Sequence, residues 1–481
     1  MGAGLALLAT NRPSLGQVRW PLLAAIGAAV VACIFSINVG TSLAGSYLRY
    51  ESLPVRLAYL GLLAVPVWLL RDDRDRDRVV AAFVVGTAIA SMEAIWQQLT
   101  AQPFRPDGNV GNAGLLGALI AMAAPLAISR ALRNDFFVVA WWIFVAALVG
   151  GLLVSTSRAG GLGAVAGCAV LVVMRFRGRA LRIAAPAATG LVALGLAAIL
   201  FIQPLRELNG DPGPARQHLW TDGLSMFLAR PITGWGEDAT GLAFGRFLTG
   251  AWSGPLVTFD RIHNGVLDVA VTQGLLGLIA LGAVIAVVAR GAWRQRSSGS
   301  VAPLAAACAG YTVWVFFNFD WAPATGAFWL LLGTCWSGVR AAQGTEQPVL
   351  NTQPILRAIG AVLLALLAAV LASGPVLAEA WYIEGHADLA VRADPLQAQY
   401  HRALGEALIQ QGYDFDGLQE LRLAGALGDS DPGFWVELGD QELRLGNPKA
   451  ARADYQMALT VDPFWQPAQQ RLAGSSAPVP I

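Results

Sequence analysis

The chain has 481 residues, of which 55% are hydrophobic and 14% are charged. This composition excludes an ordinary soluble globular protein and indicates several membrane-spanning helices. The formal net charge of +1 argues against a nucleic-acid partner, because phosphate binding needs a concentrated basic surface.

Apolar runs long enough to cross a bilayer recur up to residue 380. A run of roughly 20 residues covers a hydrocarbon core of about 30 Å. About eleven such helices are predicted, near residues 20–39, 55–70, 79–99, 112–129, 136–154, 160–174, 183–202, 265–289, 302–318, 323–339 and 356–377. The chain is therefore predicted to be an all-α, polytopic membrane protein.

Arginine-rich segments predict the orientation of these helices. When eleven helices alternate, the basic segments fall on one side, which the positive-inside rule makes cytoplasmic. The N-terminal segment 1–19 is then cytoplasmic, the transmembrane domain covers residues 20–378, and its long polar loop 203–262 is extracytoplasmic. The run Arg71–Arg78 alternates in charge, and we interpret it as a solvated cytoplasmic turn.

The composition changes after the last predicted span. Asp-Pro pairs begin at Asp394, Asp431 and Asp462, near the roughly 34-residue period of tetratricopeptide repeats. Large and small apolar residues alternate between them at the spacing typical of nested helix pairs. Residues 379–475 are therefore predicted to form an extracytoplasmic, tetratricopeptide-like α-solenoid, with an unrelated small helical domain as the alternative. Residues 476–481 are predicted to be a disordered tail.

Arg158 lies where one predicted span gives way to the next, in the stretch Ser155–Gly161. A serine or threonine there can cap the new helix, and the glycines allow a neighbouring helix to approach closely. An arginine at a helix start faces the positive end of the helix dipole, which is unfavourable unless an anion also lies there. Arg158 is thus a candidate anion ligand, and the alternative is an arginine that reaches the lipid headgroups.

The long loop carries further candidate residues. Arg216 and Trp220 belong to a predicted short amphipathic helix at the membrane surface, and the turn Gly234-Trp-Gly236 would let the backbone approach a ligand closely. His263 precedes the next span, where it is a general base, a phosphate ligand or a structural residue. No histidine spacing typical of a metal site occurs, so neither a metal nor a cofactor is predicted.

Arginines also gather on the predicted outer face, where the positive-inside rule does not place spare positive charge. An anionic ligand at the membrane surface would account for them. A lipid-linked diphosphate fits, because guanidinium groups bind phosphate oxygens through paired hydrogen bonds. The residues predicted to bind substrate are Arg49, Trp220, Gly234, Gly236, Arg261 and Asn264.

The combination resembles the O-antigen ligase and polymerase superfamily of integral-membrane glycosyltransferases. The matching pieces, in chain order, are Phe35–Asn38, Arg49–Glu51, Gly111-Asn112, Ser157–Gly161, Arg216–Trp220, Pro231–Gly236 and His263–Gly277. Each piece is short, but their order and predicted placement make the resemblance specific over residues 20–340.

The resemblance implies about a dozen helices and an extracytoplasmic catalytic loop in the cytoplasmic (inner) membrane of a bacterium. It implies metal-independent transfer of a glycan from an undecaprenyl-diphosphate carrier to an acceptor hydroxyl in surface polysaccharide assembly. By position, Arg158 and Arg216 would hold the diphosphate, and His263 would orient or deprotonate the acceptor or contact the phosphates. Displacement by one acceptor hydroxyl would invert the anomeric centre.

Two departures from the family pattern affect this expectation. Thr272 stands where family members often carry an acidic residue. A role as general base that is assigned to this acidic residue in the family therefore cannot be transferred to this chain. The C-terminal domain is unusual for a ligase and resembles that of some polymerase-like and protein-glycosylating relatives. The acceptor therefore stays open between a growing glycan, the lipid A core of lipopolysaccharide and a protein hydroxyl, and the C-terminal domain could hold the acceptor or a protein partner.

A transporter for the same lipid and a non-catalytic assembly protein are the other function classes. A transporter would carry ionisable residues near the middle of several spans. The predicted spans are nearly free of charge, with Glu93 among the few exceptions. An assembly protein would leave the outer arginines and the Gly234-Trp-Gly236 turn unexplained.

Overall fold

The computed structural model describes residues 14–344, except 48, 71, 102–104, 134–136, 202–212 and 250–258, and residues 373–474 with positions 363, 366 and 369. Every regular element that it describes is a helix. Those of the first part are η1 (Gly16–Val18), α2 (Arg19–Ile34), α3 (Val39–Ala44), α4 (Leu53–Leu69), α5 (Asp73–Thr100), α6 (Ala113–Ala131), α7 (Val138–Ser155), α8 (Arg158–Arg175), α9 (Gly178–Phe201), α11 (Gly213–Ala229), η2 (Thr240–Leu242), η3 (Phe244–Phe247), α12 (Gly265–Arg294), α13 (Val301–Phe316) and α14 (Ala322–Ala342). The C-terminal helices are α16 (Ala387–Ala393), α17 (Ala398–Gln410), α18 (Asp414–Leu427), α19 (Pro432–Arg444), α20 (Pro448–Val461) and α21 (Gln466–Gly474).

Six of these helical stretches are long and apolar enough to cross a membrane. They are Gly16–Ile34, Asp73–Thr100, Ala113–Ala131, Val138–Ser155, Arg158–Arg175 and Gly265–Arg294. The all-helical, multi-pass prediction is confirmed at this level, and the count of eleven spans stays a prediction. The predicted span 356–377 lies mostly outside the described residues, as do residues 1–13 of the N-terminal segment, parts of the 203–262 loop and the predicted tail.

Small residues set the packing of α6, α8 and α13 at the centre of the bundle. A Cβ added to Gly163 would lie 2.6 Å from the Gly310 carbonyl oxygen, and one added to Gly167 would lie 2.9 Å from that of Ala306. These pairs define an antiparallel register between α8 and α13, and the close helix approach predicted from the glycines is confirmed. The same kind of contact joins Gly160 to Gly117 and makes α6 parallel to α8.

Residues 73–78 of the charged run are helical, so its interpretation as a turn was wrong. Asp72 caps α5 by accepting a hydrogen bond from the Asp75 backbone, and the acidic first turn suits the positive end of the helix dipole. Arg76 is only 3% exposed and donates to Asp73 at 2.9 Å and to Ser337 at 3.4 Å. The run therefore joins α5 to neighbouring helices at the end of the bundle opposite the long loop.

Helix α12 is interrupted at Gly274, whose φ of 65° and ψ of −161° are not helical. The loop segment 231–236 lies against the interruption. The backbone N–H of Leu275 donates to the Pro231 carbonyl at 2.8 Å, and that of Trp235 donates to the Val271 carbonyl at 2.8 Å. The loop thus satisfies backbone groups that the interruption removes from the helix, and the interruption fixes the position of the loop.

We expect Gly274→Ala to detach this loop segment and to lower thermal stability strongly, because only glycine adopts this backbone conformation readily. A Cβ at Gly274 would also overlap the Ile232 carbonyl group. Gly282, on the same helix, has no atom within 4 Å of an added Cβ, so Gly282→Ala should be neutral or mildly stabilising. Thermal unfolding of both variants in detergent checks the expectation, and equal midpoints would contradict it.

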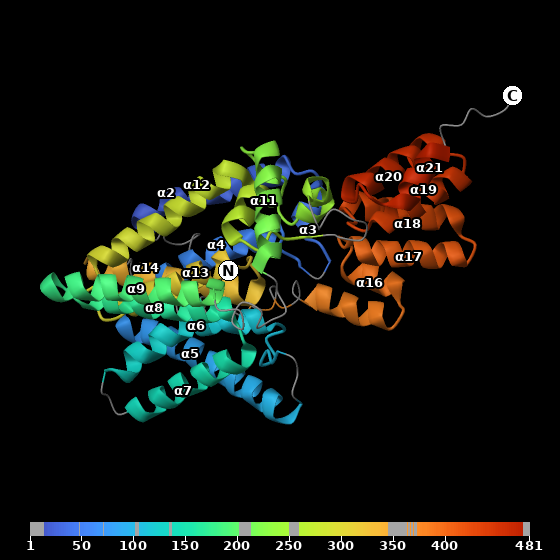
Figure 1. The fold of residues 1–481 in the computed structure, drawn as a ribbon. Coiled ribbons are helices and arrows are strands. Elements are labelled where there is room, and N and C mark those ends of the chain that lie inside the picture. The colour runs from blue at the N-terminus through green and yellow to red at the C-terminus, as the bar shows by residue number, and fades with distance from the viewer. Residues whose placement is uncertain are drawn as a thin grey trace.

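The C-terminal helices pack in antiparallel pairs around their own core. Figure 1 shows them, in orange and red, stacked beside α3 at one side of the membrane bundle. The pairs are α17 with α18 and α19 with α20, and Leu421, Phe434 and Tyr455 lie buried between them. The helical character of this region is confirmed, and its assignment to tetratricopeptide repeats stays a prediction. Helical residues 373–383 run across the boundary predicted at 378.

Polar contacts join this domain to the first part of the chain. Thr41 Oγ1 donates to the Leu427 carbonyl at 2.8 Å, and Asn38 Nδ2 donates to that of Ala426 at 3.1 Å. The Tyr47 hydroxyl donates to the Glu379 carboxylate at 2.9 Å. The domain is therefore seated on α3 and on the loop that follows it.

Candidate functional site

Three residues predicted from the loop meet at the C-terminal end of α13. Arg216 Nη1 donates to the Phe317 carbonyl at 2.6 Å. Trp220 Nε1 donates to the His263 carbonyl at 3.3 Å, and the Trp220 ring lies 6.1 Å from that of Phe317. The His263 ring contacts the Phe319 ring edge-on, with centroids 5.0 Å apart. The segment 316–319 therefore holds the side chains of α11 and the start of α12 together.

Arg158 begins α8 at the same end of the bundle. Counting back along the antiparallel register from Gly163 and Gly310 brings Arg158 level with Val315. An added Cβ on Gly265, the first residue of α12, would lie 2.6 Å from Val315 Cγ2. The starts of α8 and α12 and the end of α13 thus converge, and we name this region the loop end of the bundle.

The start of α8 has the capping that the sequence predicts. Ser157 Oγ accepts a hydrogen bond from the Gly160 backbone N–H at 3.2 Å, so the cap is confirmed. The preceding Thr156 adopts a left-handed φ of 48°, which ends α7 and turns the chain sharply into α8. This turn places the half-buried Arg158 at the positive end of the α8 dipole.

The backbone of His263 is strained, with a φ of 56° in the left-handed region. The next side chain caps α12, because Asn264 Oδ1 accepts from the backbone N–H groups of Val266 and Leu267 at 3.1 Å. The buried Asn264 amide oxygen therefore caps its own helix, and the role of Asn264 in binding substrate stays a prediction. Its cap helps hold His263 in this conformation.

Arg261 and Arg49, also predicted to bind substrate, are ion-paired within the chain. Arg261 pairs with Asp238, and Arg49 pairs with Asp260 at 2.5 Å. Although burial opposes it, the Arg49 guanidinium lowers the pKa of the Asp260 carboxyl below its usual value. These ion pairs help to hold the loop in place, and the roles of Arg49 and Arg261 in binding substrate stay predictions.

The two glycines of the Gly234-Trp-Gly236 turn approach the chain itself. A Cβ on Gly234 would lie 2.5 Å from the Thr272 backbone, and one on Gly236 would overlap Ser36. Both have positive φ angles, 71° and 107°, that suit glycine. The turn therefore approaches α12 at Gly234 and Ser36 at Gly236, and its approach to a ligand stays a prediction.

A buried charge network below the loop was not predicted. Arg56, which is 7% exposed, donates to Glu237 at 3.3 Å and to Asp320 at 2.7 Å. Gln273 Nε2 also donates to Glu237, at 2.6 Å, and the Tyr311 hydroxyl donates to Asp320 at 3.0 Å. A signal was present in the sequence, because Arg56 lies at the start of an apolar helix, where an ionisable side chain needs a partner.

Asp268 is a second residue that sequence reasoning missed. Its Oδ1 accepts from the Ile262 backbone N–H at 2.8 Å, which fixes the segment before His263. Its Oδ2 is buried and makes no hydrogen bond within the described part of the chain. Asp268 lies one helical turn before Thr272, whose hydroxyl donates to the Asp268 carbonyl at 2.7 Å. A carboxylate is thus present one turn away from the position where the family pattern expects an acid.

Glu51 makes the stability of this region depend on pH. Burial raises the pKa of its carboxyl from 4.5 to about 7, against the opposing charge of Arg56. Because its pKa is raised in the folded state, Glu51 favours folding when it is protonated. This contribution to stability is fully present below pH 4.5 and is lost as the pH rises through about 7.

We expect Glu51→Gln, which cannot ionise, to gain stability relative to the natural chain between pH 5 and pH 8. The gain is at most about 3 kcal/mol. Thermal unfolding of both proteins at the two pH values measures it, with the exposed Glu384→Gln as the control. A difference that stays constant with pH would contradict the expectation.

Comparison with protein families gives one match. Residues 142–282 match the family model described as O-Antigen ligase. A search of the curated proteins gives no match. The matched segment runs from α7 into α12 and contains Arg158, Arg216 and His263. Over this segment, the chain is similar to the O-antigen ligase family.

Proposed function

We propose that the protein is a membrane glycosyltransferase of surface polysaccharide assembly. It transfers a glycan from an undecaprenyl-diphosphate carrier to an acceptor hydroxyl at the loop end of the bundle. The observation that carries this proposal is that Arg216 and His263 contact the end of α13, level with the start of α8 where Arg158 lies, inside the family-matched segment.

The proposed roles follow from how charge moves in the reaction. The acceptor oxygen bonds to the anomeric carbon as the carbon–phosphate oxygen bond breaks, and the departing diphosphate gains negative charge. Arg216 Nη1 donates to a backbone carbonyl, which helps to fix the position of its guanidinium. Together with Arg158 it would stabilise the departing diphosphate more in the transition state than in the ground state.

His263 would orient the acceptor hydroxyl or take its proton. Because a diphosphate is already a good leaving group, a weak base suffices. A single displacement inverts the anomeric centre and needs no metal. Trp220 stays a proposed substrate contact, whereas Arg49, Arg261 and Asn264 are proposed to position the loop that carries His263.

The proposed topology keeps eleven spans in the bacterial cytoplasmic membrane. Residues 1–19 are cytoplasmic, residues 20–378 form the transmembrane domain, and the loop 203–262 and the tetratricopeptide-like domain 379–475 are extracytoplasmic. The parallel packing of α6 with α8 and the antiparallel packing of α13 support the alternation on which this topology depends. Both the loop and the C-terminal domain then lie on one side of the membrane.

Purified protein supplied with carrier-linked glycan and acceptor tests the function. We expect the sugar–phosphate bond to be exchanged for a bond to the acceptor, at a rate that EDTA does not change. Movement of the carrier lipid without bond transfer would support a transporter, and neither activity would support an assembly protein. In a deletion strain, shortened glycan chains would identify a polymerase, unattached chains a ligase, and unglycosylated protein a protein O-oligosaccharyltransferase.

A further inference from the structure

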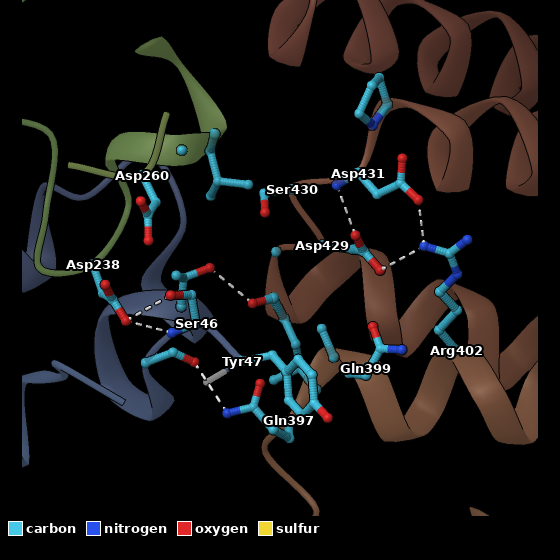
Figure 2. A pocket seen from close by; sticks show the side chains of 18 of the residues that line it. Ser46, Tyr47, Asp238, Asp260, Gln397, Gln399, Arg402, Asp429, Ser430 and Asp431 are labelled. Atoms are coloured by element: carbon cyan, nitrogen blue, oxygen red, sulfur yellow. Dashed lines mark hydrogen bonds and ion pairs between the residues drawn. The ribbon is translucent and has the colours of Figure 1, made fainter. Parts of the chain in front are cut away.

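A cavity of about 620 Å³ lies between the loop and the C-terminal helical domain. Figure 2 shows Ser46, Asp238 and Asp260 on one side and Arg402 and Asp431 on the other. Its volume falls within the range of about 300–1,000 Å³ that is usual for small-molecule sites. Both parts of the chain contribute walls, so the cavity exists only because the helical domain is seated on the loop.

Acidic groups dominate the charge of this cavity. The lining carboxylates are those of Asp238, Asp260, Glu406, Asp429 and Asp431. Arg402, which also lines the cavity, already binds Glu406 at 2.8 Å and Asp431 at 2.7 Å. Arg49 and Arg261 do not line the cavity, but they form ion pairs with Asp260 and Asp238, respectively. Five carboxylates thus face three guanidinium groups, and an anionic ligand such as the carrier diphosphate is disfavoured.

The rest of the lining suits a compact ligand that carries many hydroxyl groups. Ser46, Ser430 and Gln399 supply neutral groups that both donate and accept hydrogen bonds. Tyr47 and Trp465 add aromatic surface, and the buried Trp465 Nε1 has no hydrogen-bond acceptor among the described residues. Sugar rings present hydroxyl groups at their edges and C–H groups on their faces, which match this mixture. A basic peptide would form ion pairs with the carboxylates, but its charged groups would not use the neutral hydroxyl and amide groups of the lining.

The cavity is connected to the candidate site through two ion pairs. Asp260 pairs with Arg49, whose guanidinium lies 5.0 Å from the Phe319 ring that His263 contacts. Asp238 pairs with Arg261, which precedes His263 by two residues. The cavity therefore adjoins the segment that holds His263, the residue assigned to the acceptor.

We propose that this cavity binds an uncharged or amino-bearing stretch of the acceptor glycan, so that the C-terminal helical domain selects the acceptor. The identification of this glycan as the acceptor rests on the proposed glycosyltransferase function. Glycan binding in the cavity does not depend on that function. The helical domain is then part of the substrate site, and an acceptor rich in uronate or phosphate groups is bound poorly.

Photo-crosslinking of the full chain, in cells that make the glycan, tests the binding. Ser430 and Gln399 are replaced one at a time by p-benzoyl-phenylalanine. Arg452 and Gln410, exposed residues of the same domain that do not line the cavity, serve as controls. We expect glycan adducts at the two cavity positions, several-fold above the controls. Labelling no stronger than at the controls, or a peptide adduct in place of glycan, would overturn the proposal.

A kinetic measurement separates this proposal from the proposed function. Ser430 is exposed at the rim, so Ser430→Trp should fill part of the cavity with little effect on thermal stability. We expect the KM for acceptor to rise several-fold, with the KM for carrier-linked donor and kcat unchanged. An unchanged acceptor KM counts against the cavity. Absence of transfer in the natural chain counts against the proposed function alone, because crosslinking still reports glycan binding.

Discussion

Arg216→Ala should lower the rate of glycan transfer by a factor of about 10²–10³, the usual effect of removing one group that stabilises transition-state charge. The guanidinium is anchored to the Phe317 carbonyl, so alanine removes both the charge and its fixed position. The loss should appear mainly in kcat, because the negative charge develops as the sugar leaves. Initial rates with purified protein and carrier-linked glycan measure it.

Arg216→Lys separates charge from geometry. Lysine keeps the positive charge but lacks the planar pair of donors that matches phosphate oxygens, so we expect it to restore only part of the rate. Arg246→Ala is the matched control, because Arg246 is an exposed arginine of the same loop and should tolerate alanine. If Arg216→Ala inserts normally and transfers glycan at the natural rate, the electrostatic role is wrong.

The order and type of the helices were predictable from local features of the sequence. Apolar runs identified the six helices that are long and apolar enough to span a membrane, and Ser157 and the glycines after it marked the start and the packing face of α8. The charged run at Arg71–Arg78 was misread, because alternating charge resembles a turn as much as a helix start. The acidic side chains at its beginning were the better guide, since they favour a helix N-terminus.

The candidate site was predicted less completely, because its charges are paired across long distances in sequence. The excess of outer arginines was taken as evidence for an external anion. For Arg49, Arg56 and Arg261 the anions are the chain's own carboxylates, at Asp260, Glu237 and Asp238. No local pattern reveals that Arg49 and Arg56 have such partners, which lie 211 and 181 residues away in the sequence. Arg158 and Arg216 are proposed to bind the diphosphate because they lie inside the family-matched segment.

Loss of Arg56 should have the largest effect on stability. Arg56→Met removes the cation but leaves the buried Glu237 and the half-buried Asp320 without it. Breaking a buried ion pair from one side costs about 3–5 kcal/mol, because the remaining charge keeps its desolvation penalty. Thermal unfolding in detergent and the amount of protein in the membrane should both fall.

A second substitution at Glu237 tests whether the uncompensated charge causes the loss of stability. Adding Glu237→Gln to Arg56→Met removes one uncompensated carboxylate, so the double variant should recover part of the lost stability. Arg78→Ala breaks an ion pair whose arginine is 72% exposed, and it should change stability by less than about 1 kcal/mol. If Arg56→Met is no less stable than Arg78→Ala, the buried network does not hold the loop on the bundle.

Because this network also fixes the turn between Gly236 and Asp238, its loss should move Arg261 and the backbone of His263 before the protein unfolds.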